Sequence, residues 1–263
     1  MNLFKNLRFF LYLQRVSIRS SISVRSAFIL ESLLMLANNL IFLSIWWIFF
    51  RQFKEVSGWT INDIIALNAI GMGAFGFTNI CFGGLKQLST TIINGDIDPF
   101  MTQPKNLLIH LIGSKSRSRG WGLLMTTTIL MILGGLTSPS EIAIILIGAI
   151  CGCLVFTSMG VIVHSLVFWL GSIGSVPRKY SDALYLFAVY PTNIYSGWLQ
   201  LIMFTIIPAG VIGYIPVELL RNFFWTDLFV LLGSALVFCW LAFTIFYCGL
   251  KRYESGNHFG MRL

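Results

Sequence analysis

Long, uninterrupted apolar runs alternate with short polar segments along this chain. Each run is about 20 residues long, the length at which an α-helix crosses the hydrocarbon core of a membrane. Lipid cannot hydrogen-bond the backbone, so each crossing must be a helix or part of a closed barrel, and these runs lack the alternation of barrel strands. We therefore expect six transmembrane helices, at about 27–50, 64–85, 120–136, 142–170, 183–206 and 227–250.

Two further segments are apolar without forming a straight crossing. Residues 1–25 carry apolar side chains on one helical face and arginines on another, which predicts an amphipathic helix lying flat at the membrane surface. Residues 207–226 are apolar but interrupted by prolines and glycines, which predicts a re-entrant hairpin that dips into the outer leaflet. The expected fold is all-α and polytopic, with one transmembrane domain over residues 1–263.

The composition agrees with a protein that is solvated by lipid. Hydrophobic residues make up 56% of the chain and charged residues only 11%, whereas soluble domains have about 25% charged residues. The net charge of +8 would indicate nucleic acid as a partner of a soluble protein. In a membrane protein, basic residues instead mark the cytoplasmic loops, so we expect the bilayer as a partner and no nucleic acid.

The distribution of the 18 lysines and arginines predicts the orientation. Six crossings place three of them on one side of the membrane: Arg51, Lys54 and Arg221. The other fifteen lie in the N-terminal segment, in the loops at 86–119 and 171–182, and in the C-terminal tail. Because basic residues stay on the cytoplasmic side, both termini are expected in the cytoplasm.

Motifs for catalysis and metal binding are missing from the sequence. It contains no GxxxxGK[ST] phosphate loop, no HExxH and no GxSxG, and its five cysteines form no CxxC pair. We therefore expect no enzyme activity in this chain, no cofactor and no metal site. His164 is the only histidine deep in a predicted crossing; a hydrogen bond to a neighbouring helix is the preferred interpretation, with a proton or substrate contact as the alternative.

Glu31 is the only acidic residue inside a predicted crossing, and it shares a helical face with Asn38, seven positions later. Charged groups within a membrane tend to face the interior of the helix bundle. Two interpretations follow. Either Glu31 reaches the nearby surface or pairs with a basic residue such as Arg25, or Glu31 and Asn38 line a translocation path. A single glutamate is too few for a proton relay, which disfavours a secondary transporter.

The sequence NGDIDPFMTQPKN at 94–106 lies within a polar stretch, 86–119, that we expect to be a cytoplasmic loop. A loop that only contacts water does not need the apolar pair Phe100 and Met101. Apolar side chains flanked by acids and prolines are typical of a surface that binds a protein partner. A plain turn is the alternative interpretation.

Four features together resemble one known family. They are the basic amphipathic N-terminal helix, the pattern GDIDPFMTQPKN at 95–106, the run from YPTNIYSGWLQ to IPAGVIGYIPVELL at 190–220, and the tail RYESG at 252–256. Their order and spacing resemble the short bacterial permeases of ABC-2-type ATP-binding cassette exporters. The resemblance covers nearly the whole chain.

The resemblance implies a six-helix efflux permease of the bacterial inner membrane. It also implies a dimer with an identical or related permease, and two separate ATPase subunits. The first cytoplasmic loop of such permeases forms a coupling helix that binds the ATPase. In this sequence the corresponding residues are Asp96, Ile97, Asp98, Pro99, Phe100 and Met101. Many relatives have Leu-Leu-Arg-Pro where this chain has Phe-Met-Thr-Gln-Pro, so the arginine is missing here.

A function from another class is a secondary transporter, or a membrane scaffold protein, that acts without an ATPase. The gene neighbourhood distinguishes these possibilities. An adjacent gene for an ATPase with a phosphate loop would favour the permease, and transport driven by a proton gradient would favour the alternative.

Overall fold

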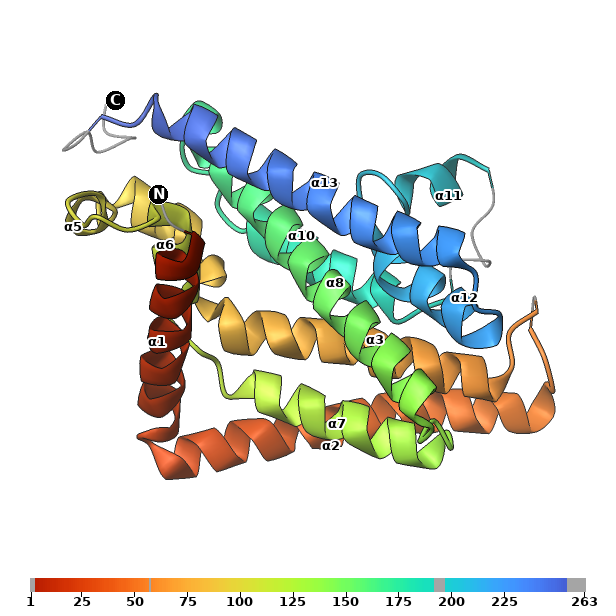
Figure 1. The fold of residues 1–263 in the computed structure, drawn as a ribbon. Coiled ribbons are helices and arrows are strands. Elements are labelled where there is room, and N and C mark those ends of the chain that lie inside the picture. The colour runs from red at the N-terminus through yellow and green to blue at the C-terminus, as the bar shows by residue number, and fades with distance from the viewer. Residues whose placement is uncertain (1–2, 57, 192–196, 255–263) are drawn as a thin grey trace.

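The computed structural model describes residues 3–56, 58–191 and 197–254. Over these ranges the chain is helical, and the only β-type pairing is an isolated bridge between Val56 and Trp59. Figure 1 shows long helices that run between two ends of a bundle, with the shorter helices gathered at those ends. The all-α prediction is therefore confirmed for the described residues.

Four helices are long and apolar enough to cross a membrane. They are α2 (Arg25–Gln52), α3 (Ile61–Cys81), α8 (Pro139–Ser165) continued by α9 (Val167–Leu170), and α13 (Trp225–Leu250). Each coincides with a predicted crossing to within a few residues. These four helices make the chain a multi-pass membrane protein.

Local sequence determines where two of these helices begin. Thr60 accepts a hydrogen bond from the backbone of Asp63, whose side chain accepts one from the backbone of Thr60. Ser138 and Glu141 form the same reciprocal arrangement at the start of α8. Such capping boxes satisfy backbone N–H groups that have no partner in the first helical turn. The two capping boxes therefore determine that the loops before α3 and α8 end at Thr60 and Ser138.

The other two predicted crossings differ from the expectation. Helix α7 (Arg119–Leu133) has 15 residues and α10 (Val176–Ala188) has 13, which corresponds to about 22 and 20 Å at 1.5 Å per residue. We expected a loop up to residue 182, but α10 begins at Val176 because Pro177 fits the first turn of a helix. It ends at Ala188, since Pro191 restricts the backbone that follows, and α11 (Trp198–Ile202) comes next.

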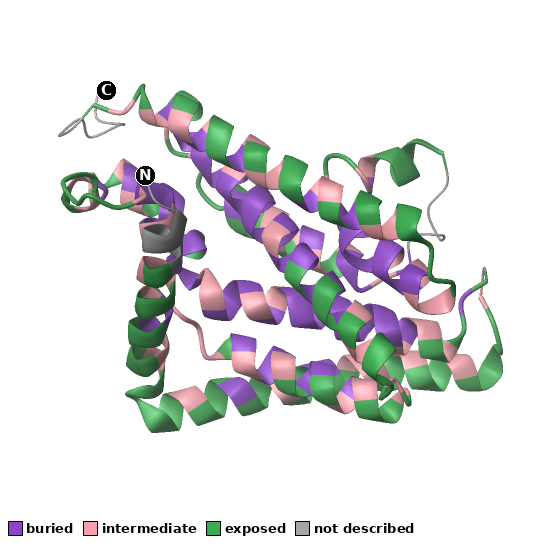
Figure 2. Cartoon of the chain, viewed as in Figure 1, coloured by how far each residue is buried: buried purple, intermediate pink, exposed green. Residues whose placement is uncertain are grey.

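The centre of the bundle is α3, which packs against both α7 and α8. Figure 2 shows α3 and much of α8 as buried, whereas α2 and α13 are mostly exposed. Glycines allow the close approach of the central helices: a Cβ atom on Gly76 would lie 3.2 Å from the backbone oxygen of Gly120. Small residues serve this purpose in membrane proteins because they let helix backbones come together.

The segment before α13 is buried within the bundle. It contains a π-helical turn (Gly210–Tyr214) and α12 (Ile215–Arg221). Ile212 is fully buried and lies beside Gly152 of α8, while Pro216 lies beside Gly148. The GxxxG pair of α8 therefore accommodates this segment and also faces α3, because a Cβ atom on Gly152 would lie 2.7 Å from the Cβ of Ala74.

The stretch 86–119, which we expected to be a cytoplasmic loop, folds as a compact group of short helices. They are a 3-10 helix (Gly83–Gln87), α4 (Leu88–Ile93), α5 (Asp98–Met101) and α6 (Leu107–Gly113). Their apolar side chains share one core with the ends of α8 and α13. The backbones approach closely, because a Cβ on Gly84 would meet the oxygen of Leu111 at 2.3 Å.

Helix α1 (Leu3–Ile22) confirms the predicted N-terminal helix, and it packs against α6. Its buried side chains are polar: Gln14, which donates to the backbone oxygen of Cys81, and Ser17. Leu11 is 60% exposed. Among the side chains that the structure describes on this helix, Phe9 and Phe10 pack against His110 and Phe82, whereas Leu11 points away from the protein.

Candidate functional site

The segment 94–106 is held in a defined conformation by its own sequence. Helix α4 is followed by Gly95, whose φ of +78° suits glycine because other residues rarely adopt it. The four residues of α5 follow, with Pro99 in the first turn. Asn106 then caps α6 by accepting a hydrogen bond of 3.0 Å from the backbone N–H of Ile109. The segment is thus a projection with fixed ends.

The six predicted partner-contact residues have three different environments. Ile97 is fully buried in the core beneath the segment. Asp98 and Phe100 are half-buried. The other three are exposed: Asp96, Pro99 and Met101, the last at 47%. Ile97 therefore anchors the segment and does not reach its surface, whereas Pro99 and Met101 present an apolar surface beside the Asp96 carboxylate.

Phe100 is held by an aromatic contact that the sequence did not reveal. Its ring lies edge-on to the ring of His110, with 4.8 Å between the centroids, and Phe9 of α1 contacts the same histidine at 5.2 Å. Burial lowers the pKa of His110 from its ordinary value of 6.5, so the ring is mostly neutral near pH 7. A neutral ring is suited to packing between two phenylalanines.

Tyr253, just after α13, was not among the predicted site residues. Its hydroxyl donates a hydrogen bond of 2.7 Å to Oδ1 of Asp98. Burial, followed by the carboxylates of Asp98 and Asp96, raises the pKa of Tyr253 to about 12, so the phenol keeps its proton. The RYESG tail was visible in the sequence, but nothing there placed it beside the 94–106 segment.

A hollow of about 340 Å³ lies beside the segment, between α4 and α6. Asp96 and Phe100 contribute to its wall, and the rest is largely polar, including Thr90 and Asn94. Lys115 also lines it and donates a hydrogen bond to the side chain of Gln87. The surface around α5 is therefore hollowed and mixed in polarity, as protein-binding surfaces are.

Basic side chains surround Lys86 at the same end of the molecule. Lys86 as a whole is exposed to solvent. Its ammonium group nevertheless lies over the ring of Phe75, 5.6 Å from the ring centroid. Desolvation by the nearby protein, followed by repulsion from Arg117, lowers the pKa of Lys86 to about 8. Arg119 and Arg178 act in the same direction, and the carboxylate of Asp182 opposes them. This end of the bundle is therefore strongly positive.

Glu31 and Asn38 both point away from the core of their own chain, and both are exposed. Among the described residues Glu31 forms no salt bridge with Arg25, and it acts electrostatically on Arg117. The buried polar residues of α2 are instead Ser32 and Asn39, each 2% exposed. Both residues thus lie on the exposed surface of α2, outside the interior of the single chain.

Ser32 and Asn39 attach α2 to α7, and the sequence analysis missed them. Ser32 donates a hydrogen bond of 3.0 Å to the backbone oxygen of Ser118, and Asn39 donates one of 3.2 Å to Thr126. Their spacing of seven residues was the available signal. The same spacing relates Glu31 to Asn38, so the pattern alone does not distinguish the two faces.

His164 hydrogen-bonds to a neighbouring helix, as preferred from the sequence. Its Nδ1 lies 3.0 Å from the hydroxyl of Ser89 on α4 and 3.2 Å from the backbone nitrogen of the same residue. Because the backbone N–H can only donate, Nδ1 is an acceptor there. His164 thus attaches α4 to α8. Among the described residues, no group of three His, Cys, Asp or Glu side chains is arranged to hold a metal ion.

The opposite end of the molecule has an ionic cluster centred on Arg221 of α12. Its guanidinium donates hydrogen bonds of 2.8 Å to Asp63, to Glu218 and to the backbone oxygen of Gly58. It also lies over the ring of the fully buried Trp59. One side chain thereby connects α12, the start of α3 and the connection before it.

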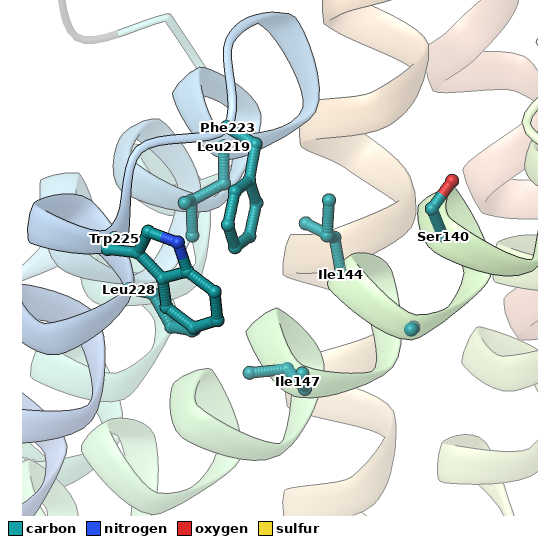
Figure 3. A pocket seen from close by; sticks show the side chains of 8 residues that line it. Ser140, Ile144, Ile147, Leu219, Phe223, Trp225 and Leu228 are labelled. Carbon is teal, nitrogen blue, oxygen red and sulfur yellow. The ribbon is translucent and has the colours of Figure 1, made fainter.

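An apolar cavity of about 390 Å³ lies near this cluster, between α8, α12 and α13. Figure 3 shows Ile144 and Ile147 on one wall, with Phe223, Trp225 and Leu228 opposite them. No charged side chain lines it. The cavity suits an acyl chain or another apolar group and provides no groups for chemistry.

Comparison with known protein families identifies the kind of protein. A family model described as ABC-2 family transporter protein matches residues 33–257. No curated protein sequence matches the chain. The matched range contains the 94–106 segment, Tyr253 and most or all of each of the four long helices.

Proposed function

This chain belongs to the ABC-2 family of transporter proteins, and from that premise we propose that it is the transmembrane permease subunit of an ABC exporter. Separate ATPase subunits, two in each complex, hydrolyse the ATP that drives export. The observation that carries the proposal is the family match over residues 33–257. The four membrane-length helices and the lack of a phosphate loop in the sequence support it.

The proposed topology has six crossings, with both termini in the cytoplasm of a bacterium. Both ends of the described chain lie at the same end of the bundle as α5 and α6, and α11 and α12 lie at the other (Figure 1). Four crossings are the long helices. Helix α7 provides another, and the chain from α10 to α11 provides the sixth. Fifteen basic residues then lie on the cytoplasmic side.

In this topology residues 207–226 are a re-entrant hairpin on the outer side. Two observations support the assignment. Ile212 contacts the middle of α8, whereas Arg221 binds Asp63 at the start of α3. Irregular backbone is tolerated at membrane depth where protein surrounds it, and the π-helical turn at Gly210–Tyr214 is buried.

The 94–106 segment is the proposed docking segment for the ATPase. Asp96, Pro99 and Met101 make the contact, with Phe100 and Asp98 at its edge, and Ile97 fixes the segment to the permease. Nucleotide binding brings the ATPase subunits together and displaces the docking segment. The permease then changes between two arrangements, of which the nucleotide-bound ATPase favours one.

A second permease, identical or related, is proposed to lie against α2. Only 6% of the most apolar window of this helix is buried within the chain, so most of its surface is available. Glu31 and Asn38 lie on that surface. With a partner placed there, this polar surface of α2 would line a path between the two permeases. The Glu31 carboxylate would then face that path, so the free-energy cost of exposing it to lipid would be removed.

Met101→Asp tests the docking assignment. We expect the variant to insert and fold, because the side chain is exposed, and to lower the permease-stimulated activity of the ATPase about tenfold or more, since a carboxylate enters an apolar contact. The measurement uses the purified permease in nanodiscs together with its purified ATPase subunit.

Val176→Asp is the matched control, because Val176 is a similarly exposed apolar residue outside the docking segment. It should leave the stimulation unchanged. Equal stimulation by the wild type and Met101→Asp would refute the docking assignment. A wild-type permease that stimulates no ATPase and transports with a proton gradient would refute the proposed function itself.

A further inference from the structure

The C-terminal extension of α13 contacts the beginning of the docking segment. Tyr253 donates its hydrogen bond to Asp98, the first residue of α5. Its hydroxyl also lies 3.7 Å from the position that a Cβ atom would take on Gly95. Because the phenol remains protonated and the carboxylate accepts, the bond is charge-assisted and stronger than one between neutral groups.

A second tyrosine contacts the other end of the same segment. Tyr247, within α13, interacts with the side chain of Asn106 and with the backbone of Leu108. Asn106 caps α6, so this contact lies where the docking segment ends. The last turns of α13 and their extension thus hold the segment at both of its ends.

The C-terminal end of α13 is itself firmly packed. Phe246 is fully buried, and its ring lies 5.8 Å from that of Phe168 of α9. Ile97 belongs to the same hydrophobic core. Arg252 additionally lies 5.9 Å from the ring centroid of Trp169. A displacement of α5 therefore acts on a helix end that cannot move independently of α8 and α9.

We propose that Tyr253 is a positioning residue that joins α5 to α13, so that a movement of the docking segment is transmitted to the last transmembrane helix. The proposal rests on the proposed function, because the ATPase is what moves the segment. Tyr247 supports the other end of the segment, whereas Tyr253 binds the first residue of α5.

Tyr253→Phe is the decisive variant, because it removes the hydroxyl and keeps the ring. Tyr12→Phe is its control, since Tyr12 is 66% exposed on α1. Asp98→Asn and the double variant test whether the two side chains act together. Amide hydrogen exchange of the permease alone reports on α5, and stimulation of the ATPase over a range of subunit concentrations separates docking from transmission.

We expect Tyr253→Phe to speed exchange of the Asp98, Phe100 and Met101 amides about tenfold, the factor that a hydrogen bond to a charged group controls, with α3 and α8 unchanged. Maximal stimulation should fall severalfold while the half-saturating ATPase concentration stays nearly constant. The double variant should be no worse than the more severe single variant.

Three results would overturn the proposal. The first is a Tyr253→Phe permease that behaves like Tyr12→Phe in both measurements. The second is faster exchange throughout the helices, which would mean a general loss of stability. The third is a change in half-saturation alone, which would make Tyr253 a docking residue. Hydrogen exchange needs no ATPase, so failure of the proposed function is recognised separately by a wild type that gives no stimulation.

Discussion

Gly122 illustrates at the scale of one residue how the helices of this protein come together. A Cβ atom at this position of α7 would lie 2.3 Å from the backbone oxygen of Ser32 and 2.9 Å from the Cβ of Met35. The first of these contacts is with backbone, which cannot rotate away. The hydrogen bonds of Ser32 and Asn39 to α7 exist because the two helices approach this closely.

Gly122→Ala should therefore destabilise the protein. The methyl group forces α2 and α7 apart and stretches the bonds of Ser32 and Asn39, a change in unfolding free energy of about 1–3 kcal/mol. The melting temperature of the purified permease in detergent, followed by tryptophan fluorescence, measures the effect.

Gly233→Ala provides the comparison for this prediction. Gly233 lies within α13, and a Cβ atom there would meet no other atom within 4 Å. The melting temperature should stay the same or rise, because alanine favours the helix. Equal melting temperatures for the two alanine variants would contradict the prediction that close packing at Gly122 holds α2 against α7.

Neighbouring residues of α2 also show the limit of sequence reasoning at this scale. Asn38 is exposed and Asn39 is buried, yet both are asparagines within the same apolar run. In a soluble protein the apolar face of a helix would identify the buried side. Here both lipid and protein interior accept apolar side chains, so periodicity carries no such information.

At the scale of elements, α12 depends on its ionic cluster to stay in place. Arg221, on its last turn, is joined to Asp63 of α3 and to Glu218. The three side chains are between 16% and 28% exposed, so their interaction is stronger than that of a fully exposed pair. Removing the arginine would leave two carboxylates partly buried without their cation.

Arg221→Gln should loosen α12 and lower the melting temperature of the permease by several degrees, because loss of one partner of a partly buried network costs about 1–3 kcal/mol. Arg178→Gln breaks the exposed pair with Asp182, whose atoms lie 4.0 Å apart, and should change the melting temperature little. A lack of effect from Arg221→Gln would contradict a role for the cluster in holding the segment.

Two elements show which boundaries sequence patterns predict well. The start of α8 was placed near residue 142 and lies at Pro139, because a capping box and a proline mark it locally. The start of α10 was placed near residue 183 but lies at Val176. Its polar residues Arg178 and Lys179 suggested a loop, whereas they occupy the exposed side of a helix.

At the scale of the whole molecule, the six-crossing topology predicts which residues can be reached from each side. Single cysteines at Lys54, Thr137 and Asn222 should react with a membrane-impermeant maleimide in intact cells. Those at Thr102, Lys179 and Lys251 should react only after the membrane is opened. All six positions are exposed, and the five native cysteines are replaced first.

Each cysteine position tests a particular crossing. Protection of Thr137 in intact cells would mean that α7, with 15 residues, does not cross. Protection of Asn222 in intact cells would mean that the proposed crossing formed by α10 and α11 does not span the membrane. Labelling of the six cysteines from the wrong side of the membrane would therefore contradict the proposed number of crossings.

The sequence by itself determined where the long apolar helices lie, that the chain is helical, and which segments carry the basic charge. These features follow from the bilayer, which requires apolar length and internal backbone hydrogen bonds. The resemblance of its motifs, later confirmed by the family match, indicated an ABC-2 permease. Only the tertiary structure decided which faces are buried, that Ile97 is an anchor, and that Tyr253 meets Asp98. The contact between Tyr253 and Asp98 joins residues 155 positions apart. Such contacts depend on close packing between helices whose apolar faces look alike in the sequence.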